Sequence, residues 1–335
     1  INRDFYIRKL LSKRENGKVK IITGIRRCGK SFLLFNLYKD LLLKEGVKEN
    51  NIIEIALDRK EYIKYRNPNL LYEYIMSKIN HNEQFYVFID EIQMSYKIKN
   101  QDVDEKYIPE EDKELLYTTF YDILNDLMSF ENIDVYVTGS NSKMLSKDIV
   151  TNFRDRGSEI TVFPLSFTEY CSVSDMEKMD ALEEYMMYGG MPLSVIEKDE
   201  SEKKKYLLSL HNNVFLKDIV ERYNLKDDVL LSSLIDILYS SVGSLTNTHK
   251  LANTAESMMK VKSSDNTIKK YIDYLEDAFL FRSSKRYDVK GKRYFGTNLK
   301  YYAADVGLRN AKLNFRQYER SHIMENIIYN ELIIK

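Results

Sequence analysis

Residues 19–34 read VKIITGIRRCGKSFLL, and this stretch decides how the rest of the chain is interpreted. Residues 19–23, VKIIT, predict a buried strand, and residues 24–31 match the pattern GxxxxGK[ST] ahead of an expected helix. Gly24 and Gly29 allow the backbone to bend so that successive amide N–H groups face phosphate oxygens, at the positive end of the helix dipole. A glycine turn at an ordinary strand-to-helix junction is the weaker alternative, because the pattern is specific in this context.

The chemistry expected of this loop is the binding of ATP with Mg²⁺. Lys30 would reach the β- and γ-phosphates, and the Ser31 hydroxyl would ligate the metal ion. Cys28 is interpreted as a tolerated loop residue because no histidine lies near it in the sequence to activate it, and alkylation of its thiol is expected to block nucleotide binding. The residues expected to contact the nucleotide are Gly24, Ile25, Arg26, Arg27, Cys28, Gly29, Lys30, Ser31, Phe32 and Ser140.

A second motif, FYVFIDE at residues 85–91, predicts an apolar strand that ends in two carboxylates. Asp90 would hold Mg²⁺ through water, and Glu91 would polarise a water molecule for in-line attack on the γ-phosphoryl group. Small-molecule kinases with a phosphate loop need no such glutamate, because the acceptor hydroxyl is their nucleophile. The pair therefore favours ATP hydrolysis, and the alternative is a strand that merely ends in solvated acids.

Polar residues also end the next predicted strand, in the sequence TGSN at residues 138–141. Ser140 and Asn141 would lie beside the acidic pair and sense the γ-phosphate or orient the water, although the same sequence is also an ordinary turn. Further on, Arg154 and Arg156 flank an acid in a glycine-terminated loop, where an arginine can neutralise transition-state charge on a neighbouring subunit's nucleotide. A surface loop with salt bridges explains the two arginines about equally well.

Composition limits the class of protein. The 335 residues predict two or three domains, and the 51 basic residues balance the 51 acidic ones, so any attraction to nucleic acid must come from local patches. Two cysteines and four histidines, without a CxxC pair, favour a reducing cytoplasmic location over a disulfide or zinc framework. No apolar run is long enough for a transmembrane helix, no secretory signal is visible, and no membrane partner is expected.

Strand and helix patterns alternate up to about residue 166, which predicts an α/β fold with a parallel sheet covered on both faces. Strands are expected at 19–23, 51–57, 84–89, 134–138 and 159–163, and helices at 31–45, 69–80, 118–130 and 142–150. A polar insert at residues 96–113 is rich in lysines and acids. Its charges are expected to be solvated, and a partner-binding loop is the alternative.

Helical patterns replace this alternation after residue 164. Helices are expected at 167–171, 176–188 and 202–223, and then at 228–240, 249–256 and 266–277. Strands follow at about 280–287 and 293–303. Three helices and a β-hairpin are the organisation of a winged-helix domain.

The expected winged helix carries a local excess of positive charge. Residues 250–300 hold 12 lysines and arginines against 6 acids, and such a patch could meet the phosphates of DNA. The residues expected to do so are Lys262, Lys269, Lys270, Arg286, Lys290, Lys292 and Arg293. A packing lid is the alternative, because Ile268, Tyr271, Ile272 and Leu275 follow the spacing of a helix core face.

Together these motifs resemble the AAA-like P-loop ATPases of bacteria and archaea that carry a region of undefined function after the ATPase domain. The matching segments are GIRRCGKSFLL, FIDEIQ, YVTGSNSKML, FRDRGSEITVFPLSF, YGGMP, FLKDIVER, YIDYLEDAFLF, RYDVKGKRYF and KYYAADVGLRN. The resemblance implies an AAA-like domain at 1–166, a helical segment at 167–225, a winged helix at 226–310, and at 311–335 the start of a nuclease-like domain that is truncated here. It also places the family's arginine on Arg156.

Residues 322–335 look like the first helix of that nuclease-like domain and carry Glu325 and Glu331. The chain ends before the further acids and the lysine that metal-dependent cleavage needs. We therefore expect no nuclease activity from these residues.

Two functions remain open at this point. The first is an Mg²⁺-dependent ATPase in which Lys30, Glu91, Asn141 and Arg156 serve hydrolysis, and whose cycle moves the later parts of the chain to act on DNA or a partner assembly. The second is an ATP-held switch or scaffold for a protein partner or for further copies of the chain, with negligible turnover. A small-molecule kinase is disfavoured by Glu91 and by the absence of a recognisable acceptor lid.

Overall fold

The computed structural model describes residues 1–80, 82–100, 103–140, 157–225, 229–259, 263–288, 293–316 and 319–334, with the backbone alone at 258–259, 286–288 and 293–297. The chain divides into two compact units. The sheet unit comprises residues 2–24 and 29–162, and the C-terminal unit comprises residues 163–335 together with residues 1 and 25–28.

A five-stranded sheet organises the sheet unit, with the strand order β2-β3-β6-β1-β7 and every pairing parallel. The strands are β1 (Val19–Thr23), β2 (Ile52–Ala56), β3 (Phe85–Asp90), β6 (Ile133–Thr138) and β7 (Gly157–Thr161). Every residue of β1, β3 and β6 is buried, as expected when helices cover both faces of a parallel sheet. The predicted parallel sheet is confirmed, although β7 begins two residues earlier than the sequence pattern suggests.

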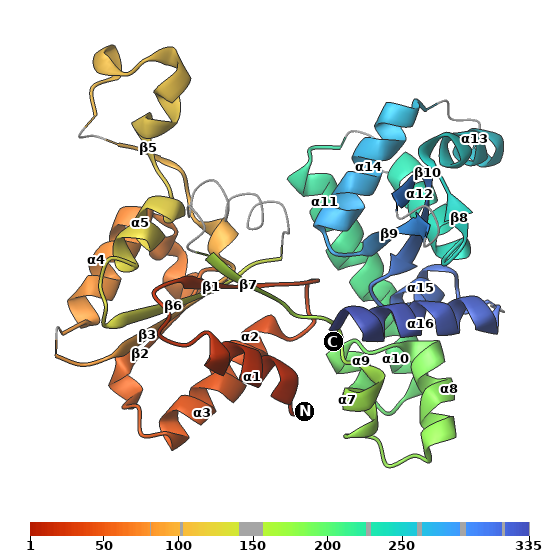
Figure 1. Cartoon of the computed structure of the whole chain (residues 1–335), viewed down its shortest axis with the longest axis horizontal. Helices are drawn as coiled ribbons and strands as arrows, with labels where there is room; N and C mark the ends of the chain where they lie inside the picture. Colours follow the sequence, from red (N-terminus) through yellow and green to blue (C-terminus); the bar gives the residue numbers. More distant parts are fainter. Residues whose placement is uncertain are drawn as a thin grey trace. The chain divides into compact units, whose positions relative to one another are not determined.

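Helices cover the two faces of this sheet (Figure 1). One face carries α1 (Asp4–Ser12), which the sequence pattern did not predict, and a longer helix that runs through α2 (Lys30–Phe32), the π-helical η1 (Leu33–Tyr38) and α3 (Lys39–Lys44). The other face carries α4 (Pro68–Lys78) and α5 (Phe120–Leu127), whose apolar side chains share one core with the strands. Three short 3₁₀ turns complete this part: η2 (Glu49–Asn51), η3 (Lys60–Arg66) and η4 (Ile92–Met94). The helix expected at 142–150 lies outside the described residues.

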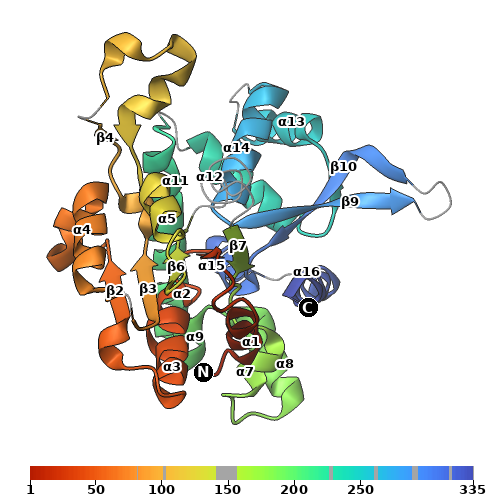
Figure 2. The ribbon, with the colours of Figure 1, turned by 60° about the vertical axis from the view of Figure 1, so that its left-hand side comes forward.

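The polar insert forms an arm that extends away from the sheet in two different views (Figures 1 and 2). Its base is a short antiparallel pair, β4 (Ile98–Lys99) with β5 (Tyr117–Thr118). Two 3₁₀ helices, η5 (Glu105–Tyr107) and η6 (Glu110–Leu116), lie between them. The described charged side chains between residues 103 and 116 are exposed, in agreement with the prediction.

The first half of the C-terminal unit is helical, as predicted. Its elements are α7 (Phe167–Cys171), α8 (Lys178–Tyr188), α9 (Pro192–Ile196), α10 (Glu200–Ser209), the π-helical η7 (Leu210–Leu216) and α11 (Lys217–Arg222). The prediction of one regular helix over 202–223 was wrong in one respect, because η7 interrupts the α-helical hydrogen bonding in its middle.

The second half contains three helices and a small antiparallel sheet. The helices are α12 (Val229–Ser240), α13 (Thr248–Met259) and α14 (Asp265–Asp277), and the strand order is β8-β10-β9. Strands β9 (Phe281–Asp288) and β10 (Arg293–Ala303) lie where they were predicted, whereas the two-residue β8 (Leu245–Thr246) was not predicted. Ile268, Ile272 and Leu275 of α14 are buried, which confirms them as core residues, and Tyr271 is half-buried.

Two helices close this unit, α15 (Val306–Lys312) and α16 (Arg320–Ile334). The Asn326 side chain of α16 pairs with the backbone of Ala303, accepting from its N–H at 2.7 Å and donating to its carbonyl at 2.9 Å. Glu325 accepts hydrogen bonds from Lys300 and from the Tyr302 hydroxyl, each at 2.7 Å. Glu331 accepts from the Phe167 N–H at 2.7 Å. Both glutamates thus serve to attach α16 to β10 and α7.

Among the described residues, no helix combines the length and apolarity needed to cross a membrane.

The buried His211 of η7 predicts a pH dependence of stability. Its side chain is fully buried, its Nε2 has no hydrogen-bond partner among the described residues, and burial lowers the pKa of the imidazole from 6.5 to about 4. The unfolded chain therefore protonates this imidazole more readily than the folded chain does. The free energy of unfolding is unaffected by this difference above pH 6.5, and it falls by about 3 kcal/mol as the pH is lowered towards 4. We expect the difference in unfolding free energy between the parent chain and His211→Leu to change by that amount between pH 7 and pH 4. A pH-independent difference would contradict this.

Candidate functional site

The loop between β1 and α2 adopts the backbone that its glycines were expected to permit. Gly24 and Gly29 have φ angles of 138° and 97°, in the region that L side chains rarely adopt. Arg27 also has a positive φ, of 64°, a conformation that costs a non-glycine residue about 1–3 kcal/mol and is found at ligand-binding sites. The loop is therefore curved at three points directly before the N-terminus of α2.

The two residues that open α2 face the loop and the third strand. Lys30 is buried, and its Nζ donates to the Gly24 carbonyl at 3.0 Å, so the ammonium group lies over the start of the loop. The Ser31 Oγ donates to Asp90 Oδ1 at 2.9 Å. A hydroxyl and a carboxylate that meet in this way are the oxygen ligands that Mg²⁺ prefers, so these residues fit the metal ion expected from the sequence.

Thr138, at the end of β6, connects the two acidic residues. Its hydroxyl donates to Asp90 Oδ1 and accepts from the backbone N–H of Glu91 at 3.0 Å. Glu91 itself has a φ of 53° and a ψ of 50°, a left-handed conformation for a non-glycine residue. The hydrogen bond from its N–H to Thr138 helps to hold this unfavourable backbone. Sequence reasoning quoted Thr138 within TGSN and gave it no role.

The carboxylate of Glu91 is held by two polar side chains. Gln93 Nε2 donates to Glu91 Oε2, and the Ser140 hydroxyl approaches the same oxygen at 3.4 Å. Gln93 Nε2 also lies 3.3 Å from Ser140 Oγ, while Gln93 Oε1 is buried without a partner among the described residues. Sequence reasoning missed Gln93. Its place in FIDEIQ, two residues after Glu91, was the only signal.

The other residues expected to contact the nucleotide differ in burial and in their partners. Ile25 and Cys28 are buried, and Phe32 is 48% exposed. Arg26, which groups with the C-terminal unit, donates from Nη1 to Asp218 Oδ1 of that unit at 3.0 Å. Asn141, Arg154 and Arg156 lie outside the described residues.

Two of the seven cations expected to contact DNA phosphates are described together with their side chains. Lys269 and Lys270 are exposed on α14. Lys262, Lys290 and Lys292 lie outside the described residues, and Arg286 and Arg293 lie where the backbone alone is described.

Two family models match the chain. Residues 16–171 match an AAA domain, and residues 179–319 match a domain of unknown function, DUF8612. The AAA match contains the phosphate loop, both acidic residues and Thr138. The AAA domain is a P-loop class of nucleotide-binding domain, which agrees with the parallel sheet and with the loop geometry described above.

Curated relatives match almost the whole chain. An uncharacterized protein of Haemophilus influenzae is 34% identical over 99% of this chain and 78% of its own length. An uncharacterized protein of Methanocaldococcus jannaschii is 28% identical over 99% of this chain and 69% of its own.

Solved structures match less closely. Orc1 of Aeropyrum pernix, solved in complex with DNA, is 10% identical with a TM-score of 0.34 over 99% of this chain and 93% of its own. DnaA of Aquifex aeolicus, solved with AMPPCP, is 14% identical with a TM-score of 0.31 over 81% and 86%. TM-scores of this size do not establish a shared overall fold, so the assignment rests on the family model and the relatives. The chain belongs to the same family of AAA-domain proteins as the Haemophilus influenzae protein.

Proposed function

We propose that this protein binds ATP with Mg²⁺ and hydrolyses it, and that the hydrolysis cycle changes the conformation of the chain. The observation that carries the proposal is the 2.9 Å hydrogen bond between Ser31 and Asp90, beside the buried Lys30 and the constrained Glu91. Lys30 and Ser31 open α2 after the loop that follows β1, and Asp90 and Glu91 lie at the end of β3, the edge at which parallel sheets place their ligand sites. The AAA family match supports the same class of chemistry.

In this proposal the phosphate loop and Lys30 hold the triphosphate. Lys30 exchanges its hydrogen bond with the Gly24 carbonyl for the β- and γ-phosphate oxygens, and the loop N–H groups bind the same phosphates. Ser31 and Asp90 would hold Mg²⁺, with Asp90 acting through water. The metal ion supplies charge neutralisation at the phosphates.

Hydrolysis needs a group that orients and deprotonates water, and we assign that role to Glu91. Ser140 already contacts its carboxylate, so it is suited to report the γ-phosphate, with Asn141 beside it in the sequence. We assign Arg156 to a neighbouring copy's nucleotide, where a guanidinium would neutralise transition-state charge.

Phosphate release from ATP and Mg²⁺ by the purified chain, with and without DNA, tests the proposal. We expect release that stops in Glu91→Gln. Release no greater than that of the variant in both conditions would contradict hydrolysis.

A second candidate function, an ATP-held switch with negligible turnover, is favoured by the contacts of Glu91. Its carboxylate accepts a hydrogen bond from Gln93 and lies close to Ser140, and an acceptor already engaged in this way is a poorer base for water. The chain would then bind ATP and change shape while Gln93 holds hydrolysis back.

Gln93→Ala separates the two functions. If Gln93 restrains Glu91, the substitution removes one hydrogen bond to the Glu91 carboxylate and makes that carboxylate a better base. The free energy of such a hydrogen bond corresponds to a rise in turnover of about tenfold. Steady-state phosphate release measures this, with Gln84→Ala as the matched control, because among the described residues Gln84 Nε2 donates to the Phe85 carbonyl alone. A fall in turnover would show instead that Gln93 holds Glu91 in its working position.

We further propose that the chain follows the four-part division 1–166, 167–225, 226–310 and 311–335, with a winged helix as its third part. The order α12, α13, α14, β9 and β10 supports the winged helix. The exposed Lys269 and Lys270 on α14 support contact with DNA phosphates, to which Lys262, Arg286, Lys290, Lys292 and Arg293 would contribute.

Salt dependence tests this contact with DNA. If about four phosphates are neutralised, the logarithm of the binding constant should fall against the logarithm of salt concentration with a slope of about −3.6. Fluorescence anisotropy with a labelled duplex measures the slope, and Lys269→Ala with Lys270→Ala should reduce it by about two contacts. A flat response would exclude DNA binding by this surface.

A further inference from the structure

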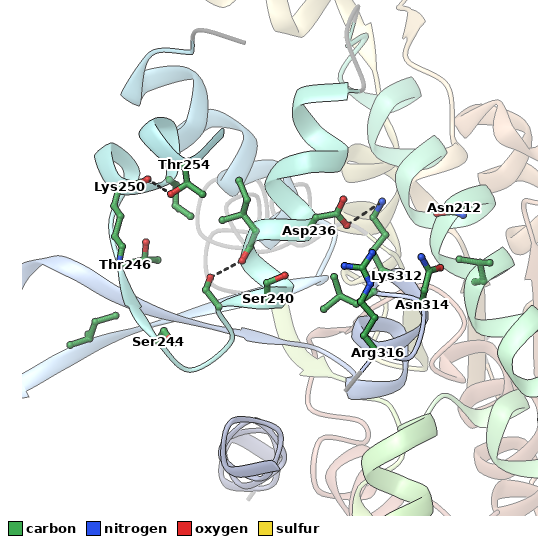
Figure 3. Close-up of a pocket in the computed structure, with 16 residues that line it drawn as sticks. Asn212, Asp236, Ser240, Ser244, Thr246, Lys250, Thr254, Lys312, Asn314 and Arg316 are labelled. Atoms are coloured by element: carbon green, nitrogen blue, oxygen red, sulfur yellow. Dashed lines mark hydrogen bonds and ion pairs between the residues drawn. The ribbon is translucent and has the colours of Figure 1, made fainter. Parts of the chain in front are cut away.

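A cleft of about 760 Å³ lies within the C-terminal unit, and its described lining includes none of the residues assigned to ATP (Figure 3). Its described walls come from α12 and α13 with the loop and strand that join them, from the end of α15 with the residues that follow it, and from one residue each of α10 and η7. A cavity of this size accommodates a ligand or a short peptide segment. Its described lining residues all belong to this one unit.

The lining of the cleft is positively charged. Lys250 stands on one side, with Lys312 and Arg316 on the other, and Asp236 lies between them (Figure 3). Lys312 Nζ is 3.4 Å from Asp236 Oδ1 and 2.9 Å from Ser232 Oγ, so those two charges compensate each other. The exposed side chains of Lys250 and Arg316 form no ion pair with any described residue. Two cations on opposite walls are therefore available to a ligand with more than one negative charge.

The other lining residues indicate what kind of anion fits. The hydroxyls of Ser240, Ser244 and Thr246 have no hydrogen-bond partner among the described residues. Leu208 and Leu245 are 38% and 41% exposed, so the cleft also offers apolar contact. None of its described lining residues is aromatic, and binding of single-stranded nucleic acid relies on aromatic side chains for base stacking. Carboxylates next to an apolar side chain match this lining better than nucleotides do.

The arm of residues 98–118 has the complementary surface. Between residues 104 and 114 it carries six acids against two lysines. Glu110 and Lys113 pair at 2.7 Å, whereas Glu111, Asp112 and Glu114 are exposed without an ion pair to any described residue. Leu115 is 60% exposed and Tyr107 is 84% exposed. An isolated arm gains nothing from presenting these apolar side chains to water.

We propose that the acidic arm of one copy docks in the cationic cleft of a second copy of this chain. The chain is neutral as a whole, yet it carries an acidic arm and a basic cleft, each with exposed apolar side chains. Glu111 and Glu114 of the arm would meet Lys250 and Arg316, and Leu115 would contact Leu208 and Leu245. The contact joins two different surfaces, so it is heterologous and adds copies head to tail. It does not depend on ATP hydrolysis.

Sedimentation velocity of the full chain without nucleotide, at low and at high salt, tests this docking. We expect concentration-dependent self-association that weakens as salt screens the charges. The cleft variant Lys250→Glu with Arg316→Glu and the arm variant Glu111→Lys with Glu114→Lys should each weaken association by about tenfold or more, since like charges would then face each other. In an equimolar mixture the two variants should associate with each other, because the native arm of the cleft variant fits the native cleft of the arm variant and the reversed arm is complementary to the reversed cleft.

The matched control is Lys178→Glu with Lys198→Glu, which reverses two exposed charges of the C-terminal unit that are not among the described cleft residues and should leave association unchanged. Far-UV circular dichroism shows that each variant is folded. A synthetic peptide of residues 104–118 should compete with association of the parent chain, and the same peptide with its acids changed to amides should not. A monomeric parent chain at low salt, association insensitive to both reversals, or a mixture of variants that stays monomeric would each overturn the proposal. Association that needs ATP and ignores the reversals would overturn it in favour of another interface.

Discussion

We expect Glu91→Gln to lower phosphate release from ATP by about 10²- to 10⁴-fold, the range by which a positioned general base accelerates a reaction. Glutamine has the same shape as glutamate and cannot accept the proton of the attacking water. Its side-chain oxygen can still accept the hydrogen bonds that Gln93 and Ser140 direct at Glu91 Oε2. The backbone of residue 91 keeps its hydrogen bond to Thr138. The substitution therefore removes the base and leaves the surrounding contacts in place.

Nucleotide binding provides the internal standard for this experiment. At ATP concentrations about 100-fold above Kd, the parent chain and Glu91→Gln should both gain about 2.7 kcal/mol of stability against unfolding. Lys30→Ala should lose that gain, because Lys30 is the cation that covers the loop. Glu61→Gln, at an exposed glutamate remote from the loop in sequence, is the matched control and should release phosphate at the parent rate. Equal phosphate release by Glu91→Gln and the parent would assign the base to another residue.

The residues of this site were foreseeable from the sequence to different degrees. Ser31 and Asp90 could be expected to meet, because the phosphate-loop motif and the acidic strand end each fix their residues at a strand's carboxyl end. The contacts of Thr138 and Gln93 could not. The contacts of Thr138 with Asp90 and of Gln93 with Ser140 depend on β6 lying between β1 and β3, and a sequence pattern does not contain the strand order.

The fold shows a similar limit. Periodicity predicted the parallel sheet and most helices, because apolar spacing reports directly which face is buried. It did not report η1 and η7, because a π-helical turn changes the hydrogen-bond register while the apolar spacing still looks helical. The short β8 was missed because two residues carry no period. Asn326 was missed because its partner, the backbone of Ala303, has no sequence signature.

The segment YGGMP at residues 188–192 contains a glycine that contacts with distant parts of the chain require. The N–H of Gly190 donates to Asp305 Oδ2 at 2.6 Å, across 115 positions of sequence, and its carbonyl accepts from the Leu165 N–H at 2.7 Å. Asp305 is buried and also accepts from the Leu308 N–H at 3.0 Å, at the start of α15. A Cβ on Gly190 would lie 2.1 Å from the Leu165 carbonyl oxygen. The backbone of Leu165 cannot withdraw without losing its own hydrogen bond to Gly190.

We therefore expect Gly190→Ala to destabilise the C-terminal unit by about 3 kcal/mol, from overpacking and from strain on two buried hydrogen bonds. Hydrogen exchange with mass spectrometry, read on α8 and α15, measures the loss locally as exchange about 100-fold faster. Exchange in α4 of the sheet unit serves as the internal reference. Gly46→Ala is the matched control: its φ is also unfavourable for alanine, at 92°, but a Cβ there meets nothing within 4 Å, so only backbone strain of about 1–2 kcal/mol is expected. Unchanged exchange in α8 and α15 of Gly190→Ala would mean that the contact between Leu165, Gly190 and Asp305 does not hold this unit together.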